Sequence, residues 1–293
     1  VRFEDARFRG TAARARYRVT DGSVELDGAD EATGRAPRVT DGQVAIDASR
    51  IDIAIESQRI SAREDVRTAM TPAAGDAAGA AGRGVRRAGL LEQDQPVYAT
   101  SAALDYDGET GLAVYTAAAP AQARLWQGDT TIQGDRVTVD DAKGSLSAAG
   151  RVASTLVVEQ RDEKTGKVER VNSIGSADEF LYEDGSRRAT YTGSAHVAGP
   201  QGDLRASRIE VYLAPSSREL ERIEAYASVS MQDALRRAAG DRLTYVSADG
   251  RYLMVGSPVK IEAECRETTG RALTFYRSTN NILVEPNEEF RTQ

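Results

Sequence analysis

Residues 46–55 of this chain read IDASRIDIAI. In the second half of this stretch, Ile51, Ile53 and Ile55 alternate with polar or small residues such as Asp52. A period of two residues places every second side chain on the same face of a β-strand. We therefore expect a strand here, with the isoleucines on a buried face and the polar residues on a solvated face.

Shorter copies of the same pattern return three times further along the chain. Each copy combines small residues, an Arg and alternating apolar residues, and the last copy lacks the opening apolar residue. The copies read IQGDRVTV at 132–139, LRASRIEVYL at 204–213 and GRALTF at 270–275. The recurrence indicates that the chain is built from internal repeats.

A second pattern precedes each copy and has the form strand, Asp-Gly turn, strand. Asp-Gly favours a tight hairpin because both residues tolerate positive φ angles. These hairpins are expected at 13–26, 103–115, 180–193 and 242–256.

The two patterns together predict one continuous all-β structure, 1–293, of about four tandem repeats. We expect at least twelve strands and almost no helix, arranged as a sandwich, jelly roll or β-solenoid. A short helix at 231–240 is the one helical candidate. The repeats span 11–70, 97–158, 174–231 and 238–290.

Two inserts interrupt the repeats. Residues 71–96 are rich in Ala and Gly and are expected to form a flexible insert loop. A hinge between two domains is the alternative, because loops this long are uncommon inside a compact domain. The charged segment 161–170 is expected to be the tip of a long hairpin.

Composition narrows the classes of function. The net charge of −7 argues against nucleic acid as a partner. The chain has one cysteine, so it forms no intrachain disulfide, and it has no apolar run long enough to cross a membrane as a helix. It begins without Met, as expected of a processed or shortened protein.

The residues give no strong catalytic signal. His196 is the only histidine, which excludes a two-histidine metal site within one chain. Cys265 alternates with apolar residues and is expected in the core, whereas Glu262 and Glu264 are expected to face outward. We expect no enzymatic activity, no cofactor and no metal, and a carbohydrate-active enzyme with paired carboxylates is a remote alternative.

The combined motifs A-x-x-L-x-Y-x-x-x-x-G, I-x-A-x-R-I-x-I and I-x-A-x-x-x-V resemble those of the OstA-like superfamily. This superfamily of periplasmic lipopolysaccharide-transport proteins includes LptA, the LptC ectodomain and the N-terminal domain of LptD. The residues that carry the resemblance are RIDI at 50–53, ISA and Val at 60–66, RLTY at 242–245 and GSPV at 256–259. The resemblance implies an open, V-shaped β-jelly roll whose apolar groove receives lipid acyl chains. It also implies a role in outer-membrane biogenesis, with OstA-like domains joining head to tail through edge strands.

We therefore expect a periplasmic protein that binds lipopolysaccharide and passes its acyl chains along the groove. A structural β-repeat scaffold or adhesin with a closed, dry core is the alternative, although the shortage of aromatic residues, 6%, favours a cavity. The residues expected to line the groove are the apolar ones of the strand faces: Ile46, Ile51, Ile53, Ile55, Ile60, Val137, Val139, Leu146, Val152, Ile209, Val211, Ile223, Val229, Ile261, Leu273 and Phe275.

Two further groups leave alternatives open. Arg14, Arg16 and Arg18 form a basic row, expected either to be a solvated edge that resists aggregation or to meet anionic head groups. Trp126 and Tyr115 are expected to pack against neighbouring side chains or to cap the groove.

Overall fold

The computed structural model describes residues 1–5, 8–29, 34–41, 43–72, 89–161, 167–215, 217–263, 266–276 and 282–285. Throughout these residues the regular structure is β-strand, and 22 strands form antiparallel pairs. The predicted all-β class with at least twelve strands is confirmed. In these ranges no helix is long and apolar enough to cross a membrane. The short helix expected at 231–240 is wrong, because these residues end one strand and begin the next.

The chain divides into two compact units, Val1–Gly150 and Arg151–Gln293, and the boundary falls within strand β14 (Ser145–Arg161). The middle of the insert, residues 73–88, and most of the tip of the second insert, residues 162–166, lie outside the described residues.

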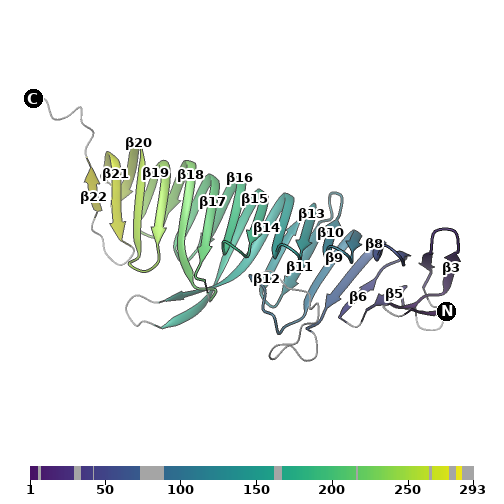
Figure 1. Ribbon diagram of the computed structural model, residues 1–293. Coiled ribbons are helices and arrows are strands. Elements are labelled where there is room, and N and C mark those ends of the chain that lie inside the picture. The colour runs from purple at the N-terminus through teal and green to yellow at the C-terminus, as the bar shows by residue number, and fades with distance from the viewer. Residues whose placement is uncertain are drawn as a thin grey trace, which may run out of the picture. The chain divides into compact units, whose positions relative to one another are not determined.

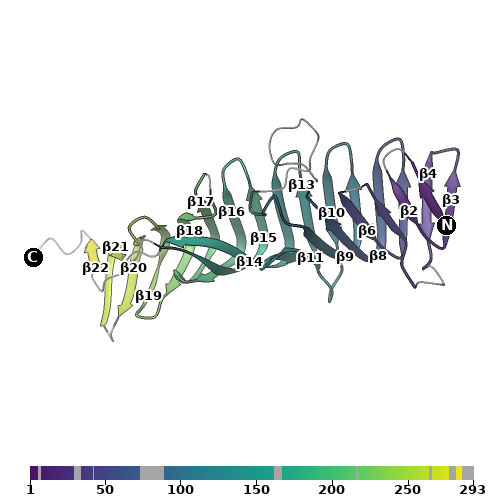
Figure 2. The same ribbon diagram turned by 90° about the horizontal axis from the view of Figure 1, so that it is seen from below.

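The first unit arranges its strands in two antiparallel rows that share β8 and β9 (Figure 2). One row runs β3-β4-β7-β8-β9-β10-β13-β14, and the other runs β1-β2-β5-β6-β8-β9-β11-β12. The bounds are β1 (Arg2–Glu4), β2 (Arg9–Thr11), β3 (Arg14–Arg18), β4 (Ser23–Asp27), β5 (Arg38–Thr40), β6 (Val44–Asp47), β7 (Arg50–Ala54), β8 (Arg59–Met70), β9 (Val97–Asp107), β10 (Leu112–Thr116), β11 (Ala123–Gln127), β12 (Thr130–Gly134) and β13 (Arg136–Asp140).

The chain passes from one row to the other through a corner of small or polar residues. Ala48 and Ser49 separate β6 from β7, and the N–H of Ser49 donates to the carbonyl of Glu64 on β8 at 2.9 Å. Glu64 itself has a φ of 62° and Asp65 a φ of 51°, the left-handed conformation that bends β8 beside them. Residues 46–55 are therefore two strands with a corner between them. The strand expected to run through Ile55 ends at Ala54, and Ile55 lies in the following turn.

The second unit is a meander in which each long strand pairs with the next (Figure 1). After the end of β14, its strands are β15 (Val168–Glu183), β16 (Arg188–Gly199), β17 (Gly202–Leu213), β18 (Leu220–Gln232), β19 (Arg236–Val246), β20 (Arg251–Ala263), β21 (Arg266–Tyr276) and β22 (Ile282–Glu285).

Aligned β-bulges form the corner in the second unit. The pairing register shifts between Thr192 and Ala195 on β16, and between Tyr226 and Val229 on β18. A bulge adds a residue to one strand and bends it, so the side chains on both sides of the bend face the same interior. Ala227, which alternation with Ile223 and Ala225 would put on the buried face of β18, is exposed because it lies within the bulge with a φ of 61°.

Several of the few aromatic residues lie in the interior. Tyr115, Tyr182, Tyr191, Tyr245, Phe180 and Phe275 are among the largest fully buried side chains. In the second unit the rings contact one another, with centroids 5.0 Å apart for Phe180 and Tyr191, and 4.6 Å for Tyr245 and Tyr252. The shortage of aromatic residues therefore does not leave the interior empty, because the rings that are present fill the space around them.

The corner predicts a specific sensitivity at Gly193 of β16. Its φ is 79°, and an added Cβ would lie 2.3 Å from Oδ2 of Asp178. Gly193→Val should therefore lower the free energy of unfolding by about 1–3 kcal/mol. Chemical denaturation followed by circular dichroism measures this change.

Gly185 supplies the matched control, because an added Cβ there meets nothing within 4 Å and its backbone is not left-handed. Gly185→Ala should shift stability by less than about 0.5 kcal/mol. Equal effects of the two substitutions would contradict the role assigned to the corner.

Candidate functional site

The apolar faces that the strands turn inward are the candidate binding surface. Every residue expected to line a groove is buried except Ile55, which is half-buried in its turn. The structure thus places these side chains in the interiors of the two units.

In the first unit these side chains form continuous apolar rows across neighbouring strands. Val24, Ile53, Ile60 and Tyr106 are paired in register from β4 to β9. Residues directly opposite each other on paired strands point to the same face. The alternate residue Asp52 therefore lies on the opposite, solvated face of β7, as the sequence pattern predicts.

In the second unit each bent strand has two arms, one on each side of the corner, and the interior lies between these arms. Ile223 and Leu243 lie on one arm, and Leu204 and Met231 lie on the other. All four line a cavity of about 20 Å³, together with Val197, Gly199, Gln201, Gly202, Tyr245 and Tyr252. That volume accommodates about one water molecule, so a long acyl chain would enter only if the arms moved apart.

A larger pocket, of about 520 Å³, lies in the first unit and was not expected from the sequence. Its lining includes Ala54, Leu112 and Val114, which alternate with the buried residues of their strands. The pocket therefore opens on the solvated face of the row. Charges of both signs surround it, and they are paired, as between Arg59 and Asp107 at 3.3 Å. The lining has four aspartates and two arginines, and several of these charges are already held in ion pairs, so we assign this pocket no ligand.

The other sequence candidates are accounted for as structural features. Nε2 of His196 lies 2.8 Å from Oδ2 of Asp203, so this nitrogen has a hydrogen-bond partner within the fold. Glu262 is exposed, whereas Glu264 and Cys265 lie outside the described residues. Across the described ranges, no group of three or more His, Cys, Asp and Glu side chains is placed to hold a metal ion.

The basic row and the two aromatic candidates also have structural partners. Arg14 pairs with Asp27 at 2.6 Å and Arg18 with Glu25 at 3.1 Å, both on the neighbouring strand β4. Tyr115 is buried, and Trp126 stacks on Tyr98 with ring centroids 5.7 Å apart.

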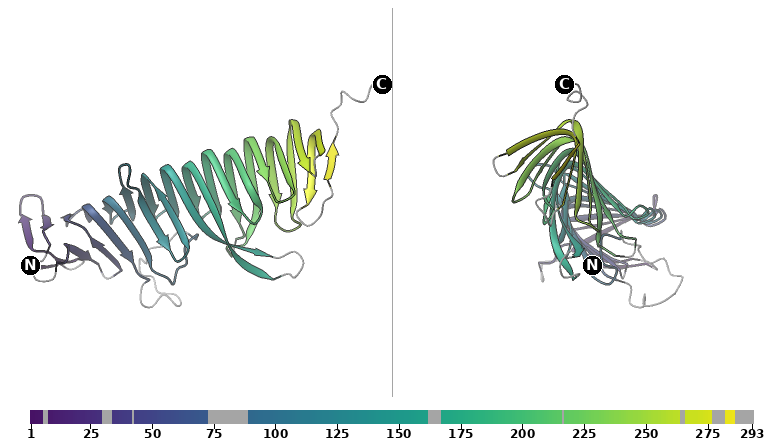
Figure 3. Two further views of the ribbon diagram at one scale, coloured as in Figure 1. Left: turned by 180° about the vertical axis from the view of Figure 1, so that it is seen from behind. Right: turned by 90° about the vertical axis from the view of Figure 1, so that its left-hand side faces the viewer.

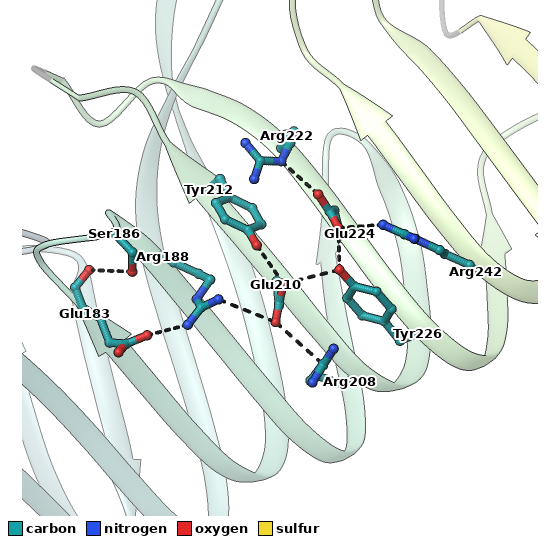
Figure 4. A network of polar contacts seen from close by, with 10 residues as sticks. All are labelled: Glu183, Ser186, Arg188, Arg208, Glu210, Tyr212, Arg222, Glu224, Tyr226 and Arg242. Carbon is teal, nitrogen blue, oxygen red and sulfur yellow. Dashed lines mark hydrogen bonds and ion pairs between the residues drawn. The ribbon is translucent and has the colours of Figure 1, made fainter.

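A network of Arg, Glu and Tyr covers the outer face of the second unit and was not anticipated (Figure 4). Glu224 on β18 accepts hydrogen bonds from Arg222 at 2.9 Å, from Arg242 at 3.1 Å and from the hydroxyl of Tyr226. On β17, Glu210 accepts one from Tyr212 at 2.7 Å. These residues alternate with the buried ones on their strands, which is the signal that places them outside.

The network shifts the pKa values of Glu224 and Tyr226. Burial acts to raise the pKa of Glu224, but the hydrogen bonds from Tyr226, Arg222 and Arg242 outweigh it, and the pKa is lowered. For Tyr226, burial and the neighbouring carboxylates raise the pKa to about 12. The carboxylate is thus held charged and the phenol neutral at neutral pH.

Glu224→Gln should lower the free energy of unfolding by about 1–2 kcal/mol at pH 7, because charged hydrogen bonds are lost. The folded-state pKa lies below the unfolded one, so this stability is present above the ordinary glutamate pKa and is lost as pH falls through the folded-state value. The difference between variant and parent should therefore shrink on acidification. Denaturation at a series of pH values measures it.

Glu267→Gln is the control, because Glu267 forms an exposed ion pair with Lys260 at 3.3 Å. Such pairs contribute little, so the change should stay below about 0.5 kcal/mol at every pH. A pH-independent loss in Glu224→Gln would contradict the electrostatic account.

Comparisons with known proteins relate the second unit to a family. Residues 175–281 match the family described as LptA/(LptD N-terminal domain) LPS transport protein. Among solved structures, the chain is similar to LptH, described as the LptA homologous periplasmic component of the lipopolysaccharide transport device from Pseudomonas aeruginosa. The identity is 12% and the TM-score 0.37, over 56% of this chain and 93% of that chain. A search of curated protein sequences found no match.

Proposed function

We propose that this chain, whose residues 175–281 match the family described as LptA/(LptD N-terminal domain) LPS transport protein, is an OstA-like protein that binds lipopolysaccharide through acyl chains held against its apolar interior. The supporting observation is the inward apolar face of each unit, where Ile53 in the first unit and Ile209 in the second are each fully buried. Proteins of this family act in the periplasm, and we place this chain there.

The proposed mechanism is passive and needs no catalytic residue. Each methylene that leaves water contributes roughly 0.8 kcal/mol, so several acyl chains provide a strong drive for binding. The arms of each unit are joined by strands that run through the corner. Acyl chains would therefore enter by separating the arms on the side that lies away from the corner. Acyl chains would move along the interior because the apolar face of each strand lies beside that of the next strand.

The proposed partners are lipopolysaccharide and other OstA-like domains. In the described part of the chain, β22 is paired along one side only, with β21, and its Leu283 is 68% exposed. An edge strand presents unpaired backbone groups that a partner strand can use. We infer that β22 pairs with the first strand of a second OstA-like domain, head to tail.

A scaffold with a dry core is a second candidate, favoured by the cavity of only about 20 Å³ in the second unit. The two candidates differ in whether lipid reaches the interior. Copurifying lipid, identified by mass spectrometry of an extract, supports the transport role.

A photo-crosslinking amino acid at position 53 should capture lipopolysaccharide, whereas one at position 52 should not. Neighbouring residues of a strand face opposite ways, and Ile53 is fully buried whereas Asp52 is partly exposed. Gel electrophoresis with lipopolysaccharide detection reads out the adduct. Equal capture at both positions would defeat the assignment of the inward face as the binding surface.

Removal of residues 281–293 should abolish concentration-dependent association, because it deletes β22, while the earlier strands stay folded. Light scattering across a concentration series measures the association, and circular dichroism checks the fold. The same concentration dependence with and without this segment would contradict the edge-strand contact.

A further inference from the structure

The last part of β14 lies across other strands of the second unit (Figure 2). We call residues 155–160 the strap. With the first part of β15 it leaves the neighbouring strands and projects as a hairpin (Figure 3). The fully described hairpins of this unit, such as those from β15 to β16 and from β18 to β19, make no such excursion and turn directly at the ends of their strands.

One contact of the strap is to the turn that follows β17. The N–H of Glu159 donates to the carbonyl of Arg218 at 2.8 Å. Glu159 also forms an isolated parallel bridge with Glu219. This turn joins β17 to β18 at the end of one arm.

The next residue of the strap contacts the turn that precedes β17. Nε2 of Gln201 donates to Oε1 of Gln160 at 3.1 Å, and the carbonyl of Gln201 accepts from the hydroxyl of Tyr252 at 2.6 Å. This turn joins β16 to β17 at the end of the other arm. Gln201 and Tyr252 also line the small interior cavity.

The two contacts define where the strap lies. Strand β17 bends at the corner, so its two ends are the tips of opposite arms. Consecutive residues, Glu159 and Gln160, contact these two tips, and consecutive Cα atoms are only about 3.8 Å apart. The strap therefore spans the side of the unit that lies away from the corner.

The face that the strap turns inward is mostly apolar. Leu156 and Val158 are each 3% exposed and Gln160 is 6% exposed. Ser154 lies on the same face of β14, and its hydroxyl is 2.8 Å from the hydroxyl of the buried Tyr191. Leu156 and Val158 thus continue an interior face into the space between the tips.

We propose that the strap is a built-in cover of the acyl-chain groove in the second unit, which an incoming lipid displaces. The inference rests on the proposed function, because it takes the interior to be the lipid site. A lipid acyl chain carries more apolar carbon than Leu156 and Val158 and replaces their contacts when it enters. The hydrogen bonds of Glu159 and Gln160 hold the cover in place until the lipid enters.

A reversible crosslink tests the proposal. Glu159→Cys with Glu219→Cys places two thiols at the bridged pair, in a background that also carries Cys265→Ser. Bridged residues on neighbouring strands are close enough for a disulfide. Oxidation should lower at least tenfold the capture of purified lipopolysaccharide by a photo-crosslinking amino acid at position 209, in the interior of the second unit, and reduction should restore it.

A second crosslink is the matched control. Glu262 and Glu267 are directly paired on β20 and β21, away from the strap contacts. Glu262→Cys with Glu267→Cys, in the same Cys265→Ser background, should capture lipopolysaccharide at position 209 equally well when oxidised and reduced. Equal capture by the oxidised strap variant would overturn the proposal, as would an equal loss in the control.

Hydrogen exchange in the chain without introduced cysteines gives an independent readout. If lipid displaces the strap, peptides covering residues 156–160 should exchange faster when lipopolysaccharide is added, whereas those of β17 and β18 should not. Unchanged or slower exchange in the strap, with lipid bound, would overturn the cover alone. A failure of this chain to bind lipopolysaccharide at all would overturn the proposed function and the cover with it.

Discussion

The fold depends on the corner at which every strand, or pair of successive strands, changes direction. A strand with period-two alternation has one apolar face, and a straight sheet of such strands would leave that face exposed on one side. The bend turns each apolar face back towards itself, so that Ile223 on one arm and Met231 on the other line the same cavity. Small residues such as Ala48, and left-handed ones such as Gly193, permit the bend at no great conformational cost.

Because of the same bend, the inner and outer faces carry different kinds of side chain. Tyrosines such as Tyr191 are buried inside, where their rings contact other aromatic rings. Outside, Arg222 lies over the ring of Tyr212 at 3.6 Å and pairs with Glu224. The outer network is closed on itself, because each carboxylate already accepts from arginine or tyrosine. Function is therefore expected inside the bend and at the strand edges, where Leu283 is exposed.

Much of this arrangement could be predicted from the sequence because alternation is a local signal. The inward positions of Ile51 and Ile53 follow from the residues between them, and the Asp-Gly turn near Asp107 follows from its own chemistry. The corner could not be predicted in the same way. Whether Ala227 continues a buried face or sits in a bulge depends on the register with the neighbouring strand, which alternation does not encode.

The strap was missed for a related reason. Leu156, Val158 and Gln160 read as an ordinary strand, and alternation correctly marks one face as buried. Their partners are two turns, near Gln201 and Glu219, that lie far away in sequence. Only folding brings these turns close to the strap, so no local sequence pattern predicts the contacts.

The alternation of corner types sets a rule for how such a chain can change in length. In the second unit β16 and β18 bend through consecutive left-handed residues, Gly193-Ser194 and Ala227-Ser228, whereas the described corner residues of β15, β17, β19 and β20 have no positive φ. From β15 to β19 two kinds of strand therefore take turns, and within this run a neighbour of the wrong kind would meet a mismatched bend. Gain or loss of one hairpin keeps the order intact, whereas gain or loss of a single strand breaks it.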